Sequence, residues 1–257
     1  MIGGRKMNLE ENLKEIAEYF GMEFSSILDN YNKVKAKYPG FVKWSNLSAE
    51  EWNEKKIDQS SINEVMNFYR NTPNYIYELM EYHSTDSKQK LSQTVIELVK
   101  EHKFRTILDF GAGICQDSIV AGREGLEATA ADIPGKTFDF GKWRIKKYSN
   151  SISTINIQDE TPLEKSYDAI TCFEVLQHVV NPEKTLLHLI NHINSDGRLF
   201  MTTRFRNNYS LALDHNEYLE DKFDEFVEKQ GLEIDEKKYM WGENEKTKYL
   251  YVLKHKR

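Results

Sequence analysis

The chain is poor in cysteine and in long apolar runs. It has two cysteines, Cys115 and Cys172, in 257 residues. That is too few for a disulfide framework or a Cys-x-x-Cys metal site, so we expect two reduced thiols. No run approaches the roughly 18 apolar residues of a membrane span, and residues 1–12 lack the apolar core of a signal peptide. These absences predict a cytoplasmic protein with no membrane segment.

The chain also lacks an excess of positive charge. Its 35 Lys and Arg face 41 Asp and Glu, which leaves a net charge of −6. A general nucleic-acid binder needs surplus cations to neutralise phosphates, so we expect no nucleic-acid partner. Hydrophobic residues make up 39% of the chain and aromatic residues 12%, which is enough for an ordinary globular core. The length favours one large domain, or one domain with a smaller appendage.

Residues 1–100 show helical periodicity and no strand-like alternation. The first apolar stripe runs from Leu9 to Phe20, and Gly21 ends it. Capping-box patterns at Ser48–Glu51 and Ser61–Glu64 predict the starts of two short helices. Further helices are expected at 25–38, 75–83 and 87–102. We predict that residues 1–100 form an N-terminal helical cap and residues 101–257 a second unit.

From residue 105 onward, strand-like and helix-like segments alternate. Strands are expected at 105–110, 126–131, 152–157, 167–173, 197–203, 232–240 and 248–253. Helices are expected at 116–125, 138–148, 182–193 and 217–230. This alternation predicts an α/β fold, a mostly parallel seven-stranded sheet with helices on both faces. The last two strands follow each other without a helix, so the final strand should run antiparallel to the others.

The sharpest local signal is the segment Ile107–Gly113, an apolar strand followed by a glycine turn. The strand carries Asp109, and Gly111 and Gly113 let the backbone approach a ligand closely. Asp132 ends the next strand, where a carboxylate can accept from both hydroxyls of a ribose. The plainer alternatives are a turn carboxylate for Asp109 and a helix cap for Asp132.

Residues 105–203, with the C-terminal strands, resemble a class I S-adenosylmethionine-dependent methyltransferase. Four motifs in order carry the resemblance, the third being of the ubiquinone/menaquinone-biosynthesis type: Ile107–Gly113, Ala131–Asp132, Tyr167–His178 and Asn194–Thr202. The chain departs from the family pattern at Cys115, where many members have a third glycine, and at Gln177, where Glu is common. The resemblance implies a Rossmann-like, doubly wound sheet and S-adenosyl-L-methionine as the cofactor.

The resemblance also implies cofactor-binding residues. Asp109 and the backbone of Gly111, Ala112 and Gly113 would hold the methionine end. Asp132 would bind the ribose, while Ile133 and Asp159 would contact the adenine. Phe173, at the end of the fourth strand, would face the methyl group.

His178 and Glu174 are the candidate catalytic residues. They lie four apart, so they would share a face if this segment is helical. A histidine titrates near neutrality and can take a proton from an acceptor hydroxyl or amine. Methyl transfer also runs on alignment alone, so His178 is either a general base or a residue that packs under the cofactor.

Candidate substrate residues come from three segments. The cap is rich in aromatic side chains, among them Tyr82 and His83, which either cover the site or form the core of the cap. Trp143 lies on a second apolar face of helix 138–148, which meets either the N-terminal helices or the pocket. The basic residues of that helix, such as Arg144, favour a solvated face; the alternative is a contact with a phosphate or carboxylate of the substrate. The loop after the fifth strand adds Arg204, Asn207, Tyr209 and His215.

The sequence therefore predicts an enzyme that transfers a methyl group from S-adenosylmethionine to a small-molecule acceptor held between cap and sheet. One alternative is a non-catalytic S-adenosylmethionine-binding partner subunit. Another is a nicotinamide-dependent dehydrogenase, which is disfavoured because Gln116 stands where the third glycine of its motif belongs. His188 and His192 have the spacing of a metal pair but no third ligand, so we expect no metal.

Overall fold

The computed structural model describes residues 8–38, 44–149, 151–158, 163, 165–205, 211–241 and 248–256, with only the backbone of Trp241. Six helices come first: α1 (Leu9–Phe20), α2 (Phe24–Lys37), α3 (Trp44–Lys55), α4 (Ile62–Asn71), α5 (Asn74–His83) and α6 (Asp86–Glu101). The remaining helices are α7 (Gln116–Arg123), α8 (Lys136–Tyr148), α9 (Pro182–Ile190) and α10 (Leu219–Lys229), with short 3-10 turns at Leu176–His178 and Asp214–Asn216.

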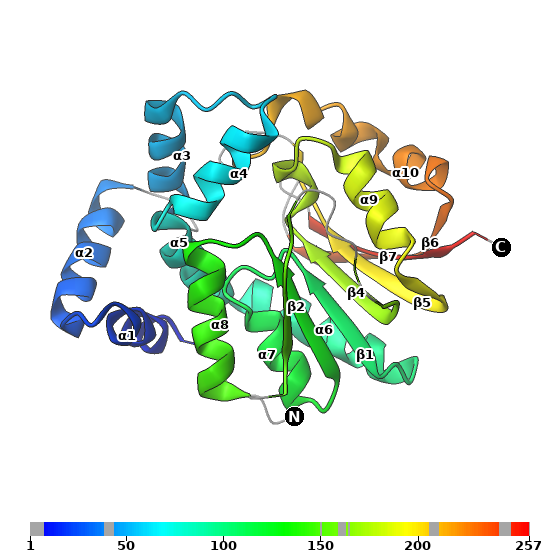
Figure 1. The fold of residues 1–257 in the computed structure, drawn as a ribbon, viewed down its shortest axis with the longest axis horizontal. Helices are drawn as coiled ribbons and strands as arrows, with labels where there is room; N and C mark the ends of the chain where they lie inside the picture. Colours follow the sequence, from blue (N-terminus) through cyan, green and yellow to red (C-terminus); the bar gives the residue numbers. More distant parts are fainter. Residues whose placement is uncertain are drawn as a thin grey trace.

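A seven-stranded sheet forms the centre of the fold, in the order β3-β2-β1-β4-β5-β7-β6 (Figure 1). The strands are β1 (Thr106–Phe110), β2 (Glu127–Asp132), β3 (Ser153–Asn156), β4 (Tyr167–Phe173), β5 (Ile193–Thr202), β6 (Leu232–Trp241) and β7 (Lys248–His255). Strands β1 to β5 pair in parallel, while β7 pairs antiparallel with both β5 and β6. The predicted fold class, with its single antiparallel final strand, is confirmed.

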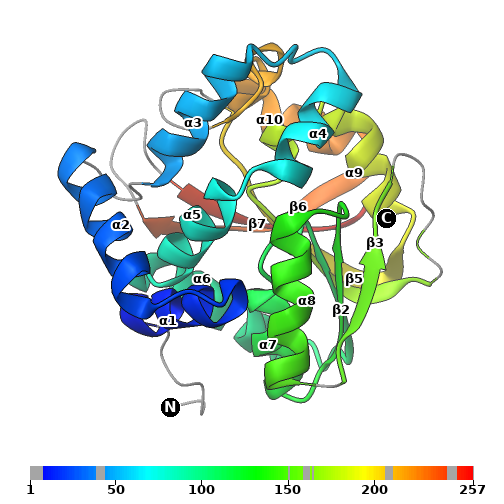
Figure 2. The ribbon, with the colours of Figure 1, turned by 60° about the vertical axis from the view of Figure 1, so that its left-hand side comes forward.

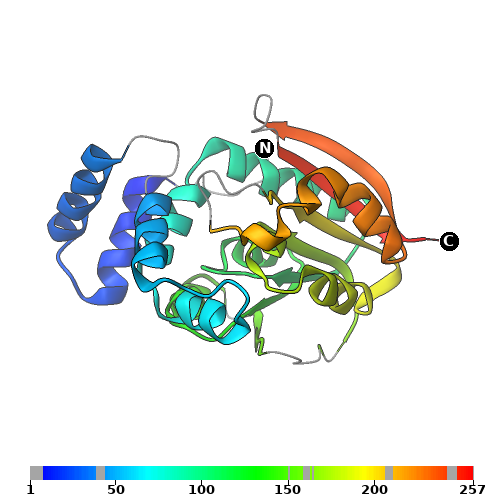
Figure 3. The same cartoon turned by 90° about the horizontal axis from the view of Figure 1, so that it is seen from above.

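Helices cover both faces of the sheet. On one face, apolar side chains of α6, α7 and α8 share a core with Ile107, Ala130 and Phe200. On the other face, α9 and α10 pack over Leu108, Ile170 and Leu199. The view from above separates these two helical layers (Figure 3). Helix α6 therefore belongs to the core of the sheet, although it lies mostly before residue 100.

Helices α1 to α5 form a separate layer at one end of the molecule (Figure 2). Leu13, Ile16 and Ile76 pack there against Phe140 of α8. The N-terminal helices therefore cover the second apolar face of α8, as one of the two alternatives predicted. Near the start of α8, a Cβ atom added to Gly135 would lie 2.5 Å from the Cα atom of Arg70 on α4, so α4 also packs directly on the sheet unit.

A buried arginine fixes α1 to this unit. Arg144 of α8 donates through Nε to Glu15 Oε2 at 2.8 Å, through Nη1 to the Ile114 carbonyl at 2.8 Å and through Nη2 to Gln116 Oε1 at 2.6 Å. Its side chain is only 2% exposed. The expected solvated basic face of α8 is therefore wrong at Arg144, because the chain supplies a carboxylate from 129 residues away.

One of the two predicted capping boxes caps a helix and the other does not. Ser61 caps α4 as predicted, its Oγ accepting from Glu64 N at 3.3 Å. Ser48 does not cap a helix, because α3 already begins at Trp44 and Ser48 lies buried inside it. Among the described residues, no helix combines the length and the hydropathy needed to cross a bilayer.

Candidate active site

A cavity of about 970 Å³ opens at the carboxyl ends of the parallel strands. Its floor is formed by the residues that follow β1, β2, β4 and β5, and its roof by α4 and α5 of the N-terminal layer. This is the edge of an open α/β sheet at which ligands bind. The volume lies at the upper end of the range for ligand pockets, roughly 300–1,000 Å³, so there is room for a cofactor and a second small molecule.

The glycine turn after β1 packs closely against one side chain of α5 and one of the segment that follows β4. Gly111 and Gly113 have φ values of 74° and 52°, which favour glycine. A Cβ atom at Gly111 would lie 2.2 Å from Val175 Cγ2, and one at Gly113 would lie 2.6 Å from Leu79 Cδ1. Cys115, at the expected third glycine position, also has a positive φ of 58°. The backbone at Cys115 therefore has the positive φ that glycine favours, although the residue is not a glycine.

Asp132 lies at the end of β2 beside this turn. Its Oδ2 accepts from Gly113 N and its Oδ1 from Ile133 N, both at 2.6 Å. Burial raises the pKa of its carboxyl to about 6, although the two backbone hydrogen bonds act in the opposite direction. The carboxylate is thus placed by the turn that would hold the methionine end, and it lines the cavity.

Asp109 has a more internal environment than the sequence indicated. Its Oδ2 accepts from Ser118 N at 3.1 Å and from Ser118 Oγ at 2.7 Å, and its Oδ1 accepts from Thr171 Oγ1 at 3.1 Å. Burial, followed by the charge of Asp117, raises the pKa of Asp109 to about 6. The two carboxylate oxygens of Asp109 therefore connect β1 to α7 and to β4, next to the glycine turn.

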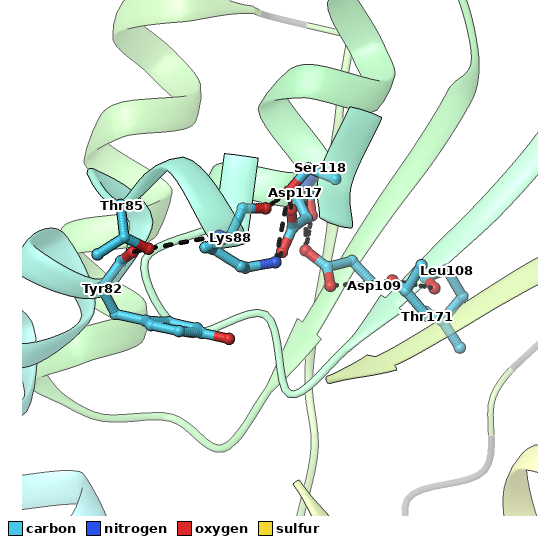
Figure 4. A network of polar contacts seen from close by, with 9 residues as sticks. Tyr82, Thr85, Lys88, Leu108, Asp109, Asp117, Ser118 and Thr171 are labelled. Carbon is cyan, nitrogen blue, oxygen red and sulfur yellow. Dashed lines mark hydrogen bonds and ion pairs between the residues drawn. The ribbon is translucent and has the colours of Figure 1, made fainter. Parts of the chain in front are cut away.

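A buried ion pair next to Asp109 was not predicted. Lys88 of α6 points at Asp117 of α7 (Figure 4), with Nζ and Oδ2 2.5 Å apart and the Lys88 side chain only 2% exposed. Burial opposes the charge on Asp117, but Lys88 outweighs it and lowers the pKa of this carboxyl. Lys88 is on the same helical stripe as the buried Leu91 and Val95, and a lysine on an apolar stripe was the available signal.

Glu174 follows β4 in a left-handed conformation, with φ 57°. Its Oε2 accepts from Lys248 Nζ at 2.5 Å and from Gln177 Nε2 at 3.2 Å. Burial works against its charge, but the Lys248 ammonium holds the pKa of Glu174 below its usual value. The segment to His178 contains only a 3-10 turn. The shared helical face expected for Glu174 and His178 is therefore wrong, although both side chains line the cavity.

His178 is held by the backbone of the segment that follows β5. Its Nδ1 lies 2.9 Å from the Leu211 carbonyl and 3.0 Å from Tyr69 Oη. A carbonyl only accepts, so Nδ1 carries the proton and Nε2 is the basic nitrogen. Nε2 has no hydrogen-bond partner among the described residues. Burial lowers the pKa of His178, so the ring is neutral at neutral pH and can accept a proton from a bound molecule.

Two helical stripes form the roof of the cavity. Helix α4 contributes Ile62, Val65, Met66 and Tyr69, and α5 contributes Tyr75, Glu78, Leu79, Tyr82 and His83. The opposite side of α5, including Ile76 and Met80, packs in the core of the N-terminal layer. Of the cap aromatics, Tyr82 and His83 thus line the cavity. Burial lowers the pKa of His83 to about 3, so this ring is uncharged.

The remaining candidates divide into three groups. Ile133, Phe173 and Arg204 line the cavity, as do Ala112 and the two turn glycines. Trp143 and His215 do not: Trp143 packs against Tyr19 and Phe140, and His215 lies exposed beside the Val180 carbonyl. These two predicted substrate residues therefore lie outside the cavity, because α1 covers the Trp143 face of α8 and His215 turns outward. Asp159, Asn207 and Tyr209 lie outside the described residues.

Known methyltransferases are similar to this chain in sequence and in fold. The sequence profile of the methyltransferase domain family matches residues 80–237. A ubiquinone biosynthesis O-methyltransferase from Rickettsia akari is 27% identical over 133 residues, which are 49% of this chain and 53% of the relative. The chain thus spans about half the length of the curated relatives it matches.

Solved structures share the fold at low sequence identity. An S-adenosylmethionine-dependent methyltransferase from Leishmania major superposes with a TM-score of 0.61 at 13% identity, covering 80% of this chain and 91% of that one. Magnesium protoporphyrin IX methyltransferase from Synechocystis PCC 6803, with bound S-adenosylmethionine, gives 0.56 at 15% identity and covers 77% and 98%. At such low sequence identities, the structural similarity shows a shared fold and nothing more.

The chain belongs to the methyltransferase domain family. The predicted class, a class I enzyme whose cofactor is S-adenosylmethionine, is confirmed at the level of the family.

Proposed function

We propose that this chain transfers a methyl group from S-adenosylmethionine to a small-molecule acceptor, which binds between α4 and α5 and the edge of the sheet. Helices α1 to α5 supply the cap in this proposal, while α6 and residues 101–257 supply the methyltransferase unit. The observation that carries it is one continuous cavity, which reaches from the Gly111–Gly113 turn and Asp132 to the two roof helices. The name of the Rickettsia akari relative, a ubiquinone biosynthesis O-methyltransferase, supports an acceptor of small size.

The residues on the floor of the cavity fit the cofactor. Gly111 and Gly113 carry no side chains, so the peptide carbonyls of the turn can lie close to the methionine end of the cofactor. The N–H groups of residues 111–113 already donate to Ala131 and Asp132. Asp132 would accept from the ribose hydroxyls and Ile133 would pack on the adenine. The Lys88 ammonium, which also pairs with Asp117, would donate to the carboxylate of the methionine end. Bound S-adenosylmethionine supplies an electrophilic methyl group on its sulfonium.

His178 is the proposed general base. Its protonated Nδ1 is fixed by the Leu211 carbonyl, so Nε2 is free to take a proton from an acceptor hydroxyl or amine. Glu174, paired with Lys248, would hold charge near the same ring rather than exchange protons, because its pKa lies below the usual value. Phe173 and the apolar stripe of α4 exclude water from the acceptor.

Isothermal titration tests the cofactor, and labelled methyl transfer tests the activity. We expect S-adenosylmethionine and S-adenosylhomocysteine to bind and NAD not to bind. Incubation with a metabolite extract and methyl-labelled cofactor should yield a labelled small molecule that mass spectrometry identifies. Binding of NAD in place of S-adenosylmethionine would point to a dehydrogenase. Cofactor binding without transfer in any extract would favour the non-catalytic subunit.

A further inference from the structure

Most carboxyl groups that line the cavity are compensated by the protein itself. Asp117 pairs with Lys88, and Glu174 pairs with Lys248. Asp132 accepts from two backbone N–H groups, and Asp109 from Ser118 and Thr171. A buried carboxylate needs such partners, because removing a charge from water is costly.

Glu78 is the exception. It lies at the middle of the α5 stripe, and its Oε2 accepts from Ser48 Oγ of α3 at 2.7 Å. Its Oε1 has no hydrogen-bond partner among the described residues, and no Lys or Arg of that part of the chain forms an ion pair with Glu78. Burial raises the pKa of Glu78 to about 7, against the effect of the Ser48 hydrogen bond.

The surroundings of Glu78 favour a cation over other partners. Tyr75 and Tyr82 are one turn away on either side of Glu78 along the α5 stripe, and Tyr69 of α4 lines the same cavity. The faces of aromatic rings attract ammonium groups. Next to these rings, the stripe of Ile62, Val65 and Met66 offers an apolar wall. A ligand with an apolar body and a basic nitrogen matches both surfaces.

We propose that Glu78 recognises the methyl acceptor by pairing with a basic amino group that the acceptor carries. This inference rests on the proposed function, because it assigns one end of the acceptor that the cavity would hold. Glu78 would act as a specificity-determining residue. The cofactor would be held separately, by the turn after β1 and by Asp132.

Three probes with the same phenol ring test the proposal without knowledge of the natural acceptor. Tyramine carries an ammonium group, 4-ethylphenol is neutral, and 3-(4-hydroxyphenyl)propionate carries a carboxylate. Their binding is measured by titration against the full chain saturated with S-adenosylhomocysteine at pH 8, where Glu78 is mostly ionised. We expect tyramine to bind about 10-fold or more tighter than 4-ethylphenol, and the propionate to bind weakest.

Glu78→Gln keeps the size of the side chain and can still accept from Ser48. We expect this variant to bind tyramine and 4-ethylphenol equally, with unchanged affinity for S-adenosylhomocysteine. Glu97→Gln, on an exposed position of α6, is the matched control and should keep the wild-type preference. Failure of wild type to bind S-adenosylhomocysteine would count against the proposed function itself.

The remaining outcomes overturn the inference alone. They are cofactor binding without detectable tyramine binding, equal binding of tyramine and 4-ethylphenol, or a tyramine preference that survives in Glu78→Gln. Tightest binding of the propionate would also overturn it and would assign recognition to Arg204, whose buried Nε has no hydrogen-bond partner among the described residues.

Discussion

The floor and the roof of the cavity are built in different ways. On the floor, adjacent parallel strands end together, so the backbone register alone brings Phe110 and Ala131 side by side, with the turn and Asp132 just beyond them. On the roof, side chains converge because single stripes of α4 and α5 face inward. In the proposed function, the floor would bind the cofactor, whereas the roof would determine which second molecule fits.

The strongest way to test this division is at His178, where floor and roof meet. His178→Ala should lower turnover by about 10²–10⁴ and leave cofactor affinity nearly unchanged. The wild-type rate should fall as the pH drops through the histidine pKa, which burial places below its usual value, because only neutral imidazole accepts a proton. His215→Ala is the control, since His215 is exposed outside the cavity. Weaker cofactor binding with an unaltered pH profile would instead assign His178 to packing.

Arg144 tests whether the N-terminal layer is an integral part of the fold. Arg144→Leu should lower the free energy of unfolding by about 3–5 kcal/mol, because Glu15 is left buried without its cation. The double variant Glu15→Leu with Arg144→Leu should recover part of this loss. Urea denaturation measures both. A single variant within about 1 kcal/mol of wild type would mean that this ion pair contributes little to holding the layer in place.

Asp132 tests the floor alone. Asp132→Ala should weaken cofactor binding by about 2–4 kcal/mol, because two ribose hydroxyls lose a charged acceptor. The pKa of Asp132, about 6, predicts a second effect. The affinity of the wild type for the cofactor should fall as the pH drops below about 6, because the carboxylate is then protonated. Titration calorimetry at several pH values measures both effects. Binding within twofold of wild type would remove Asp132 from the site.

The smallest expected effect concerns the stability of the roof. The pKa of Glu78 is about 7 in the folded protein against 4.5 in the reference state, so folding disfavours its ionised form. The folded state then binds more protons between these values, and stability falls as the pH rises through them. Glu78→Gln removes this cost and should raise the free energy of unfolding by about 1–3 kcal/mol at pH 8, and by much less below pH 4.5. An equal gain in the free energy of unfolding at pH 8 and below pH 4.5 would contradict the raised pKa of Glu78.

The floor was largely predictable from the sequence, and the roof only in part. Strand ends and glycine turns follow local rules, so Asp132, the two turn glycines and the sheet could be placed from the chain alone. Lys88 and Glu78 could not, because their roles depend on which stripe of a helix faces the cavity. Trp143 failed for the same reason. The sequence allows two partners for its helix face, the N-terminal helices and the pocket, because periodicity does not say what covers a face.

The Arg144 network limits how the N-terminal layer can be exchanged. A designer who wished to give this sheet a new specificity would be tempted to replace the whole helical layer as one module. The guanidinium in α8 and its neighbour Gln116 would remain behind, along with the space once filled by Glu15. A transplanted layer would need a carboxylate at that point. Otherwise Arg144 would also have to change, so the practical unit of exchange is the pair of inward stripes on α4 and α5.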